Sequence, residues 1–228
     1  PISSGPVQIT GNGADLYIVD GTNRYSYVIA TTTFATISDG AFNGGDTTDV
    51  IDNYMIYNNP SSNQWGWTDV GSIVSNALNV GSKLVGPDYV KVVIADHRQV
   101  LLLGERTSER WTDVGGGTGQ EFAVIPGSAI QHGIQAKFSA ARLGEGVAFL
   151  ALDNRGQATV IVWGATVTQP QRISTFAIEN AIQGYATTSD AIGYTYTQAG
   201  HEFYMLTFPT EDVTWCYDLS TQKWHQRA

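Results

Sequence analysis

The pentapeptide Trp-Thr-Asp-Val-Gly occurs twice in this chain, and the two copies constrain the fold more than any other feature. They occupy residues 67–71 and 111–115, so they lie 44 residues apart. Self-similarity at a fixed spacing of this size is typical of repeat architectures such as β-propellers. We therefore expect structural units of about 44 residues, with Trp67 and Trp111 at equivalent positions in neighbouring units and packed between sheets.

Most of the chain alternates apolar and polar residues with the period of two that is typical of β-strands. β-branched and aromatic residues dominate these segments, which lie at residues 14–20, 89–96, 99–105, 146–152, 158–164 and 201–208. Helical periodicity is confined to residues 173–185, where Ser174 is the expected N-cap, and to the short segment 71–81. The sequence predicts an all-β fold.

Five hairpin-like turns recur along the chain, at residues 20–24, 58–63, 104–110, 153–157 and 208–213. Measured between Gly21, Pro60, Thr107, Arg155 and Glu211, the steps are 39, 47, 48 and 56 residues. A large aromatic follows each turn, the set being Tyr25 and Tyr27, Trp65 and Trp67, Trp111, Trp163, and Trp215. A strand–turn–strand unit of about 40–55 residues with such an aromatic on its second strand is typical of a propeller blade.

We predict a single β-propeller domain over residues 1–228, with about five four-stranded blades, five or six in number. The approximate blade limits are 1–48, 49–92, 93–136, 137–185 and 186–228. The alternative is another all-β sandwich or barrel, whose turns would come every 8–12 residues or so without a long-range repeat. The chain opens without Met, and we expect it to be a fragment of a longer protein.

Composition limits the classes of partner. The net charge is −9, from 21 acidic and 12 basic residues. Duplex DNA is bound by clustered Lys and Arg, but the densest cluster, Arg106 with Arg110, is interleaved with Glu105 and Glu109. We expect no tight direct binding of nucleic acid. No apolar run approaches the ~18 residues of a membrane span, so no membrane partner is expected either.

No constellation of side chains indicates catalysis. The four histidines, His97, His132, His201 and His225, show neither the HExxH pattern nor a spacing typical of zinc ligands. Asp96-His97 is expected in a turn between two strands, and Cys216 as a small buried hydrophobe on a strand. We therefore predict that the chain is not an enzyme and has no catalytic, cofactor-binding or metal-binding residues.

Two glycine-containing loops were considered as ligand sites. Residues 38–53 carry Asp39, Asp46, Asp49 and Asp52, whose carboxylates could hold Ca²⁺. Their spacing fits neither an EF-hand nor the nonapeptide calcium repeat, so a solvated loop is expected, with calcium as the alternative. Residues 115–120, GGGTGQ, lack the Lys-Ser/Thr of a phosphate-binding loop and are expected to connect two blades.

A carbohydrate-binding or glycosidase-type propeller facing the host surface is the alternative function. Exposed Trp would bind sugar in such a protein, and paired carboxylates would hydrolyse it. The repeated S-x-D-x-G-x-x-W motif of sialidases is absent. One bulky aromatic per blade is instead expected to fill the space between neighbouring sheets.

The second half of the chain resembles the packaged-DNA stabilization proteins of short-tailed phages, which are tail accessory factors that complete the head. The segment 126–157 is similar to the central part of that family, and the set GHxFYxLxFP, TWxYD and WHxR is its most specific pattern. The residues that carry the resemblance are Pro170, Arg172, Ile173, Ser174, Ile178, Glu179, Ala181, Ile182, Ser189, Asp190, Ala191, Gly200, His201, Phe203, Tyr204, Phe208, Pro209, Thr210, Thr214, Trp215, Tyr217, Asp218, Trp224, His225 and Arg227.

The resemblance implies a structural virion protein of the tail and portal vertex, which closes the head after packaging and retains the genome. It implies a homo-oligomer, a hexameric ring, that links the portal and adaptor rings to the tail needle or tailspikes. Its expected location is the virion, and the host cytoplasm during assembly. Members of the family are longer than this chain.

Overall fold

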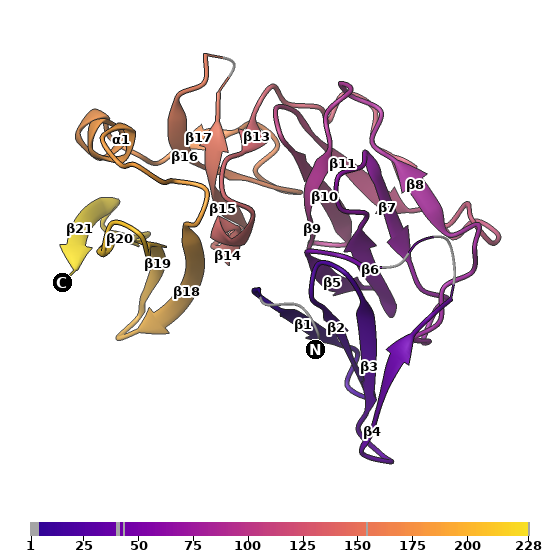
Figure 1. Ribbon diagram of the computed structural model, residues 1–228. Coiled ribbons are helices and arrows are strands. Elements are labelled where there is room, and N and C mark those ends of the chain that lie inside the picture. Colours follow the sequence, from indigo (N-terminus) through magenta and orange to yellow (C-terminus); the bar gives the residue numbers. More distant parts are fainter. Residues whose placement is uncertain (1–4, 40–41, 43, 154, 228) are drawn as a thin grey trace. The chain divides into compact units, whose positions relative to one another are not determined.

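A computed structural model describes residues 5–39, 42, 44–153 and 155–227. The chain divides into two compact units, residues 1–129 and 130–228, and each is described by itself. The described residues form five antiparallel sheets, as expected for a five-bladed β-propeller (Figure 1). The prediction of an all-β fold with five blades is confirmed.

The first unit contains three four-stranded sheets, each built from strands that follow one another in the sequence. Sheet A consists of β1 (Gln8–Gly11), β2 (Asp15–Val19), β3 (Arg24–Val28) and β4 (Thr33–Ile37). Sheet B consists of β5 (Thr48–Ile51), β6 (Tyr54–Asn58), β7 (Gln64–Trp67) and β8 (Val80–Ser82). Sheet C consists of β9 (Val90–Asp96), β10 (Gln99–Gly104), β11 (Ser108–Asp113) and β12 (Phe122–Val124).

The second unit contains two sheets, a short 3₁₀ helix and one α-helix. Sheet D consists of β13 (Gly133–Ile134), β14 (Ala141–Leu143), β15 (Gly146–Leu152), β16 (Ala158–Trp163) and β17 (Gln171–Arg172). Sheet E consists of β18 (Ile192–Gln198), β19 (His201–Phe208), β20 (Val213–Asp218) and β21 (Lys223–Arg227). The helices are η1 (Lys137–Ser139) and α1 (Phe176–Gln183).

Sheet D has five strands, but two short strands, β13 and β14, together take the place of a single first strand. β13 and β14 both pair with β15, β13 near its end and β14 near its beginning. The residues between them contain η1, and Ser139 in η1 accepts the N–H of Leu150 with its hydroxyl (3.0 Å). The first strand of this blade is therefore one strand interrupted by a helical turn.

The five turns identified in the sequence have one structural role. Each joins the second strand of its sheet to the third: β2 to β3, β6 to β7, β10 to β11, β15 to β16, and β19 to β20. Residue 154, in the fourth of these turns, lies outside the described residues. The aromatic residues that follow the turns consequently all lie on third strands.

Apolar side chains fill the spaces between sheets. Tyr17, Val19 and Ile37 of sheet A pack against Met55 and Tyr57 of sheet B. The other face of sheet B packs against sheet C in a second cluster, which contains Ile56, Trp65, Trp67, Val100, Leu102, Trp111 and Phe122. Sheet B therefore buries both faces, as expected for an internal blade.

The two WTDVG copies end the third strands of adjacent sheets, but their tryptophans face opposite ways. Trp65 lies 4.8 Å from Trp67 beside it and 5.6 Å from Trp111 of sheet C, measured between ring centroids. Trp67 thus faces sheet C, whereas Trp111 faces back to sheet B within the same cluster. The prediction of equivalent environments is wrong for the side chains, although both lie between sheets on third strands.

Four local predictions need correction. Residues 71–81 form turns followed by the start of β8, and no helix. The helix at 173–185 is confirmed as α1, but its N-cap is Thr175, whose hydroxyl accepts the N–H of Ile178. Residues 115–120 join β11 to β12 within sheet C and do not connect two blades. The predicted limits at 48/49 and 92/93 fall inside β5 and β9, and the limit at 136/137 separates β13 from its sheet.

Replacement of Trp65 tests whether the cluster between sheets B and C stabilises the first unit. Trp65 is fully buried, so Trp65→Ala is expected to lower the free energy of unfolding by about 3–5 kcal/mol. Urea denaturation followed by circular dichroism measures the change. Leu78→Ala, at a side chain that is 67% exposed, is the control and should change stability by about 0.5 kcal/mol or less. Equal losses in the two variants would contradict the packing described.

Candidate functional site

The aspartates of the loop at 38–53 are dispersed among separate partners. Asp39 accepts hydrogen bonds from Arg24 and from the N–H of Ser75. Asp49 accepts the N–H of Ala95 (2.8 Å), and Asp52 pairs with Arg98. Residues 40, 41 and 43 of this loop lie outside the described residues. Within the described part of the chain, no group of three or more His, Cys, Asp or Glu residues could hold a metal ion.

The other side chains considered for chemistry, His97 and Cys216, have structural roles. His97 and Arg98 form the two-residue turn between β9 and β10, both with positive φ, and His97 Nδ1 lies 2.7 Å from Asp96. The expected turn is confirmed. Cys216 lies on β20, is fully buried, and burial raises the pKa of its thiol. A thiol in such surroundings is a poor nucleophile.

Four of the six tryptophans are buried and offer little surface for stacking on sugar, whereas Trp215 and Trp224 are partly exposed. Trp65, Trp67 and Trp163 are among the largest fully buried side chains of the protein. Two indole N–H groups donate to carboxylates of sheet C: Trp67 to Glu121 (3.0 Å) and Trp111 to Glu109 (2.8 Å). Trp67 thereby contacts the segment before β12, whereas the Trp111 bond lies within β11. Both side chains lie between sheets B and C, as the sequence predicted for the blade aromatics.

Sheets A and B are joined by a buried arginine. Arg24, on β3, is fully buried and donates to the Tyr17 hydroxyl (2.8 Å) and to Ser75 Oγ (3.2 Å). Its other terminal nitrogen donates to the Asp39 carboxylate (2.9 Å), while the guanidinium lies 4.4 Å from the centre of the Tyr57 ring. Burial raises the pKa of both phenols, Tyr17 and Tyr57, so they remain neutral hydrogen-bonding groups at physiological pH.

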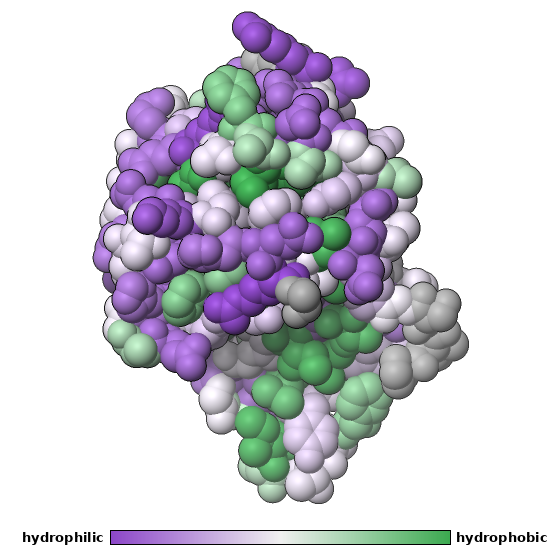
Figure 2. Space-filling model, turned by 90° about the vertical axis from the view of Figure 1, so that its left-hand side faces the viewer, coloured by the Kyte–Doolittle hydropathy of each residue, from purple (hydrophilic) through white to green (hydrophobic). Residues whose placement is uncertain are grey.

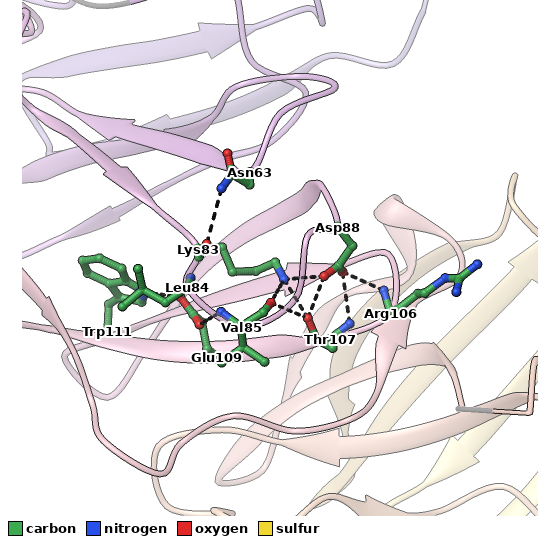
Figure 3. A network of polar contacts seen from close by, with 9 residues as sticks. All are labelled: Asn63, Lys83, Leu84, Val85, Asp88, Arg106, Thr107, Glu109 and Trp111. Atoms are coloured by element: carbon green, nitrogen blue, oxygen red, sulfur yellow. Dashed lines mark hydrogen bonds and ion pairs between the residues drawn. The ribbon is translucent and has the colours of Figure 1, made fainter.

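A second buried ion pair ties the segment after β8 to sheet C. Figure 3 shows Lys83, Asp88 and Thr107 pointing toward one another. Lys83 Nζ donates to Asp88 Oδ1 and to Thr107 Oγ1, both at 2.6 Å, and also to the Val85 carbonyl. The second Asp88 oxygen accepts the N–H groups of Arg106 (2.8 Å) and Thr107 (3.1 Å).

The donors around Asp88 determine its ionisation. Burial alone would raise the pKa of this carboxyl, but the hydrogen bonds from Lys83 and from the Arg106 and Thr107 backbone lower it to about 2. Glu109, next to this pair in Figure 3, accepts the N–H groups of Leu84 and Val85 at 2.9 Å. The segment 83–88 is therefore fixed by two buried carboxylates, at Asp88 and Glu109.

The second unit has a comparable pair. Glu179 of α1 is buried and accepts from both Arg172 on β17 and the Ser174 hydroxyl. The Arg172 guanidinium also lies 4.6 Å from the centre of the exposed Phe176 ring. None of the three buried ion pairs, Arg24–Asp39, Lys83–Asp88 and Arg172–Glu179, was predicted from the sequence. A weak signal existed in Lys83, a single charge after thirteen uncharged residues that follow Asp69.

The second half of each WTDVG copy contains an exposed valine and a glycine with positive φ. Gly71 and Gly115 have φ values of +67° and +63°, which glycine adopts without strain. Asp113 accepts the N–H of Gly115 (2.8 Å), whereas Asp69 accepts the Asn79 side-chain amide. Between them, Val70 and Val114 are 62% and 55% exposed. The two copies thus share a glycine with positive φ and an exposed valine, but only the first forms a turn, in which the N–H of Ser72 donates to the Asp69 carbonyl.

These features define a scaffold-type β-propeller, whose buried charges join strands and loops in fixed pairs. The chain matches the family model described as Bacteriophage P22 Gp10, beta-propeller, over residues 2–228, and it belongs to that family. The family consists of phage structural proteins that stabilise packaged DNA, and is not a family of enzymes. Membership places the protein in the virion.

No curated protein sequence matches the chain significantly. In the described part of the chain, no helix has the length and hydrophobicity needed to cross a membrane.

The Lys83–Asp88 pair predicts a pH dependence of stability. Because the folded-state pKa of Asp88 is about 2, below its ordinary value near 4, its contribution is present above about pH 4. It is lost as the pH falls from about 4 to about 2. Asp88→Asn leaves Lys83 buried without its counterion and is expected to cost about 3–5 kcal/mol at neutral pH.

Urea denaturation of both proteins between pH 2 and pH 7 measures this effect. The stability difference between wild type and Asp88→Asn should shrink by about 2–3 kcal/mol on acidification. Glu105→Gln, which removes the half-exposed Lys91–Glu105 pair, is the matched control and should cost less than about 1 kcal/mol. A difference for Asp88→Asn that does not change with pH would contradict the assigned ion pair.

Proposed function

We propose that this protein closes the phage head after DNA packaging, at the tail and portal vertex, and so retains the genome. The family match over residues 2–228 is the observation that carries the proposal. In this role the propeller is a non-enzymatic structural part that links the portal and adaptor rings to the tail needle or tailspikes. The protein assembles as a homo-oligomer, a hexameric ring, in the virion after synthesis in the host cytoplasm.

Net charge supports mechanical closure over direct binding of DNA. A chain of net charge −9 repels a duplex at long range, and its few basic residues include several held in ion pairs, such as Arg24 and Lys83. Retention of the genome then depends on contacts between protein subunits. An acidic wall would also let DNA pass during ejection without sticking. A tight, salt-sensitive complex of this protein with duplex DNA, measured by fluorescence anisotropy, would contradict this mechanism.

Retention of DNA by phage particles tests the proposed function. Particles assembled without this protein are expected to package their genome and then lose it, so that their DNA becomes sensitive to nuclease. A complementing copy with Glu105→Gln should restore protection, because this pair is half exposed and outside the buried junctions. A copy with Trp65→Ala should restore it poorly, because the fold is destabilised. Particles that keep their full genome without the protein would refute the proposal.

A further inference from the structure

The first unit exposes apolar side chains on a sheet face and on two loops, and only the loops point to a partner. The outer face of sheet A carries Ile9 and Phe34, which are 60% and 51% exposed. Figure 2 shows apolar side chains gathered in the lower part of the molecule, where Figure 1 shows β3 and β4. Faces of sheets stack on other sheets in a propeller, so an exposed sheet face is not by itself evidence of another protein.

The loop at residues 68–79, which joins β7 to β8, has an inverted distribution of polar and apolar residues. Three of its polar residues are buried: Thr68, Ser75 and Asn79. Three of its apolar residues are exposed: Val70 (62%), Val74 (49%) and Leu78 (67%). Isolated apolar residues are common on protein surfaces, whereas several on one loop that buries polar side chains indicate an interaction surface.

Hydrogen bonds hold this loop in place. The Tyr57 hydroxyl donates to Ser75 Oγ (3.0 Å), which anchors the middle of the loop to sheet B. The Asn79 side chain donates to Asp69 Oδ1 (2.8 Å), and the N–H of Asp69 donates to the Val74 carbonyl (2.8 Å). The exposed apolar side chains are therefore positioned before any partner binds, which lowers the entropic cost of binding.

The loop at residues 114–121, between β11 and β12, extends the apolar surface. It carries Val114, which is 55% exposed. The N–H of Gly119 donates to the Asn79 side chain (3.2 Å), and a Cβ added to Gly119 would lie 3.0 Å from Leu78 Cβ, so the two loops are in contact. Both loops lie at strand ends, and sheet B has both faces covered within the first unit. Stacking of sheets on sheet B therefore leaves these loops exposed.

Three aspartates lie at the margin of this surface: Asp52, Asp69 and Asp113. Asp69 and Asp113 directly precede the exposed valines of the two WTDVG copies. All three lie close to Tyr54 of β6, whose pKa is raised by burial first and then by nearby charges that include these carboxylates. Arg98 is paired with Asp52 (3.2 Å). The apolar surface is consequently bordered by an excess of negative charge.

We propose that these two loops bind an apolar segment, flanked by Lys or Arg, of a different protein of the tail and portal vertex. The exposed apolar side chains form the centre of the interface and the aspartates form its rim, an arrangement typical of protein interfaces. Basic side chains of the partner complement the aspartates. A second copy of this chain fits poorly, because its net charge is −9. The inference rests on the proposed function and adds the chemistry of one partner.

Photo-cross-linking in phage particles tests which protein covers the loops. With p-benzoylphenylalanine in place of Leu78 or Val70, ultraviolet light is expected to join this protein to another virion protein. Mass spectrometry should identify an apolar, basic segment at the cross-link. The same group in place of Leu84, which is 64% exposed and lies outside both loops, is the control and should not give this product.

The outcomes of this experiment separate the inference from the proposed function. Particles that contain no copy of the protein would refute the proposed function, and the inference with it. Particles that contain the protein but show no cross-link from Leu78 or Val70 would overturn the inference alone. A cross-link to an acidic segment, or to a second copy of this chain, would also overturn it alone.

Substitutions measure the apolar and charged contributions separately. The double variant Val70→Ser with Val114→Ser should reduce incorporation into particles about tenfold, whereas Leu84→Ser should not. Asp113→Asn keeps the oxygen that accepts a backbone N–H but removes the charge, so incorporation should fall about threefold, with Glu105→Gln as the matched control. Urea denaturation confirms that each variant is as stable as wild type. Wild-type incorporation of the folded double variant would overturn the proposal.

Discussion

The aromatic layer between sheets B and C is the interaction on which the first unit depends most. Trp65 and Trp67 contact each other and Phe122 there, and Trp65 also contacts Trp111, with ring centroids 4.8–5.6 Å apart. The layer leaves no space for a larger residue at Gly81, where an added Cβ would lie 2.6 Å from Trp65 Nε1. The indole N–H groups of Trp67 and Trp111 donate to the buried carboxylates of Glu121 and Glu109. Two of the three indole N–H groups in the layer are therefore paired.

Sequence alone predicted the elements of the fold because their signals are local. Period-two alternation located the strands, and the recurring turns located the join between second and third strands. The facing of Trp111 could not be read in this way, because a shift of one residue in register turns a side chain to the other face of a sheet. The pair of Lys83 with Thr107 was also hidden, since its members are 24 residues apart and only the stacking of sheets brings them together.

The repeated WTDVG segment determines a local backbone conformation, but it does not determine which face of the sheet its tryptophan occupies. Its last residues share a positive φ at Gly71 and Gly115, which glycine adopts without strain, although only the first copy forms a turn. Its tryptophans, Trp67 of sheet B and Trp111 of sheet C, pack in one cluster from the two opposing sheets. Buried charges in fixed pairs and the absence of a metal-binding cluster among the described residues agree with the family of phage structural proteins to which the chain belongs.

Electron microscopy of portal complexes assembled with the complete protein tests the proposed place in the virion most directly. We expect a ring of added density next to the adaptor, containing propeller-shaped domains and absent from complexes prepared without the protein. Portal complexes that show no added density, under conditions where the other tail proteins assemble, would contradict closure of the portal vertex by this protein.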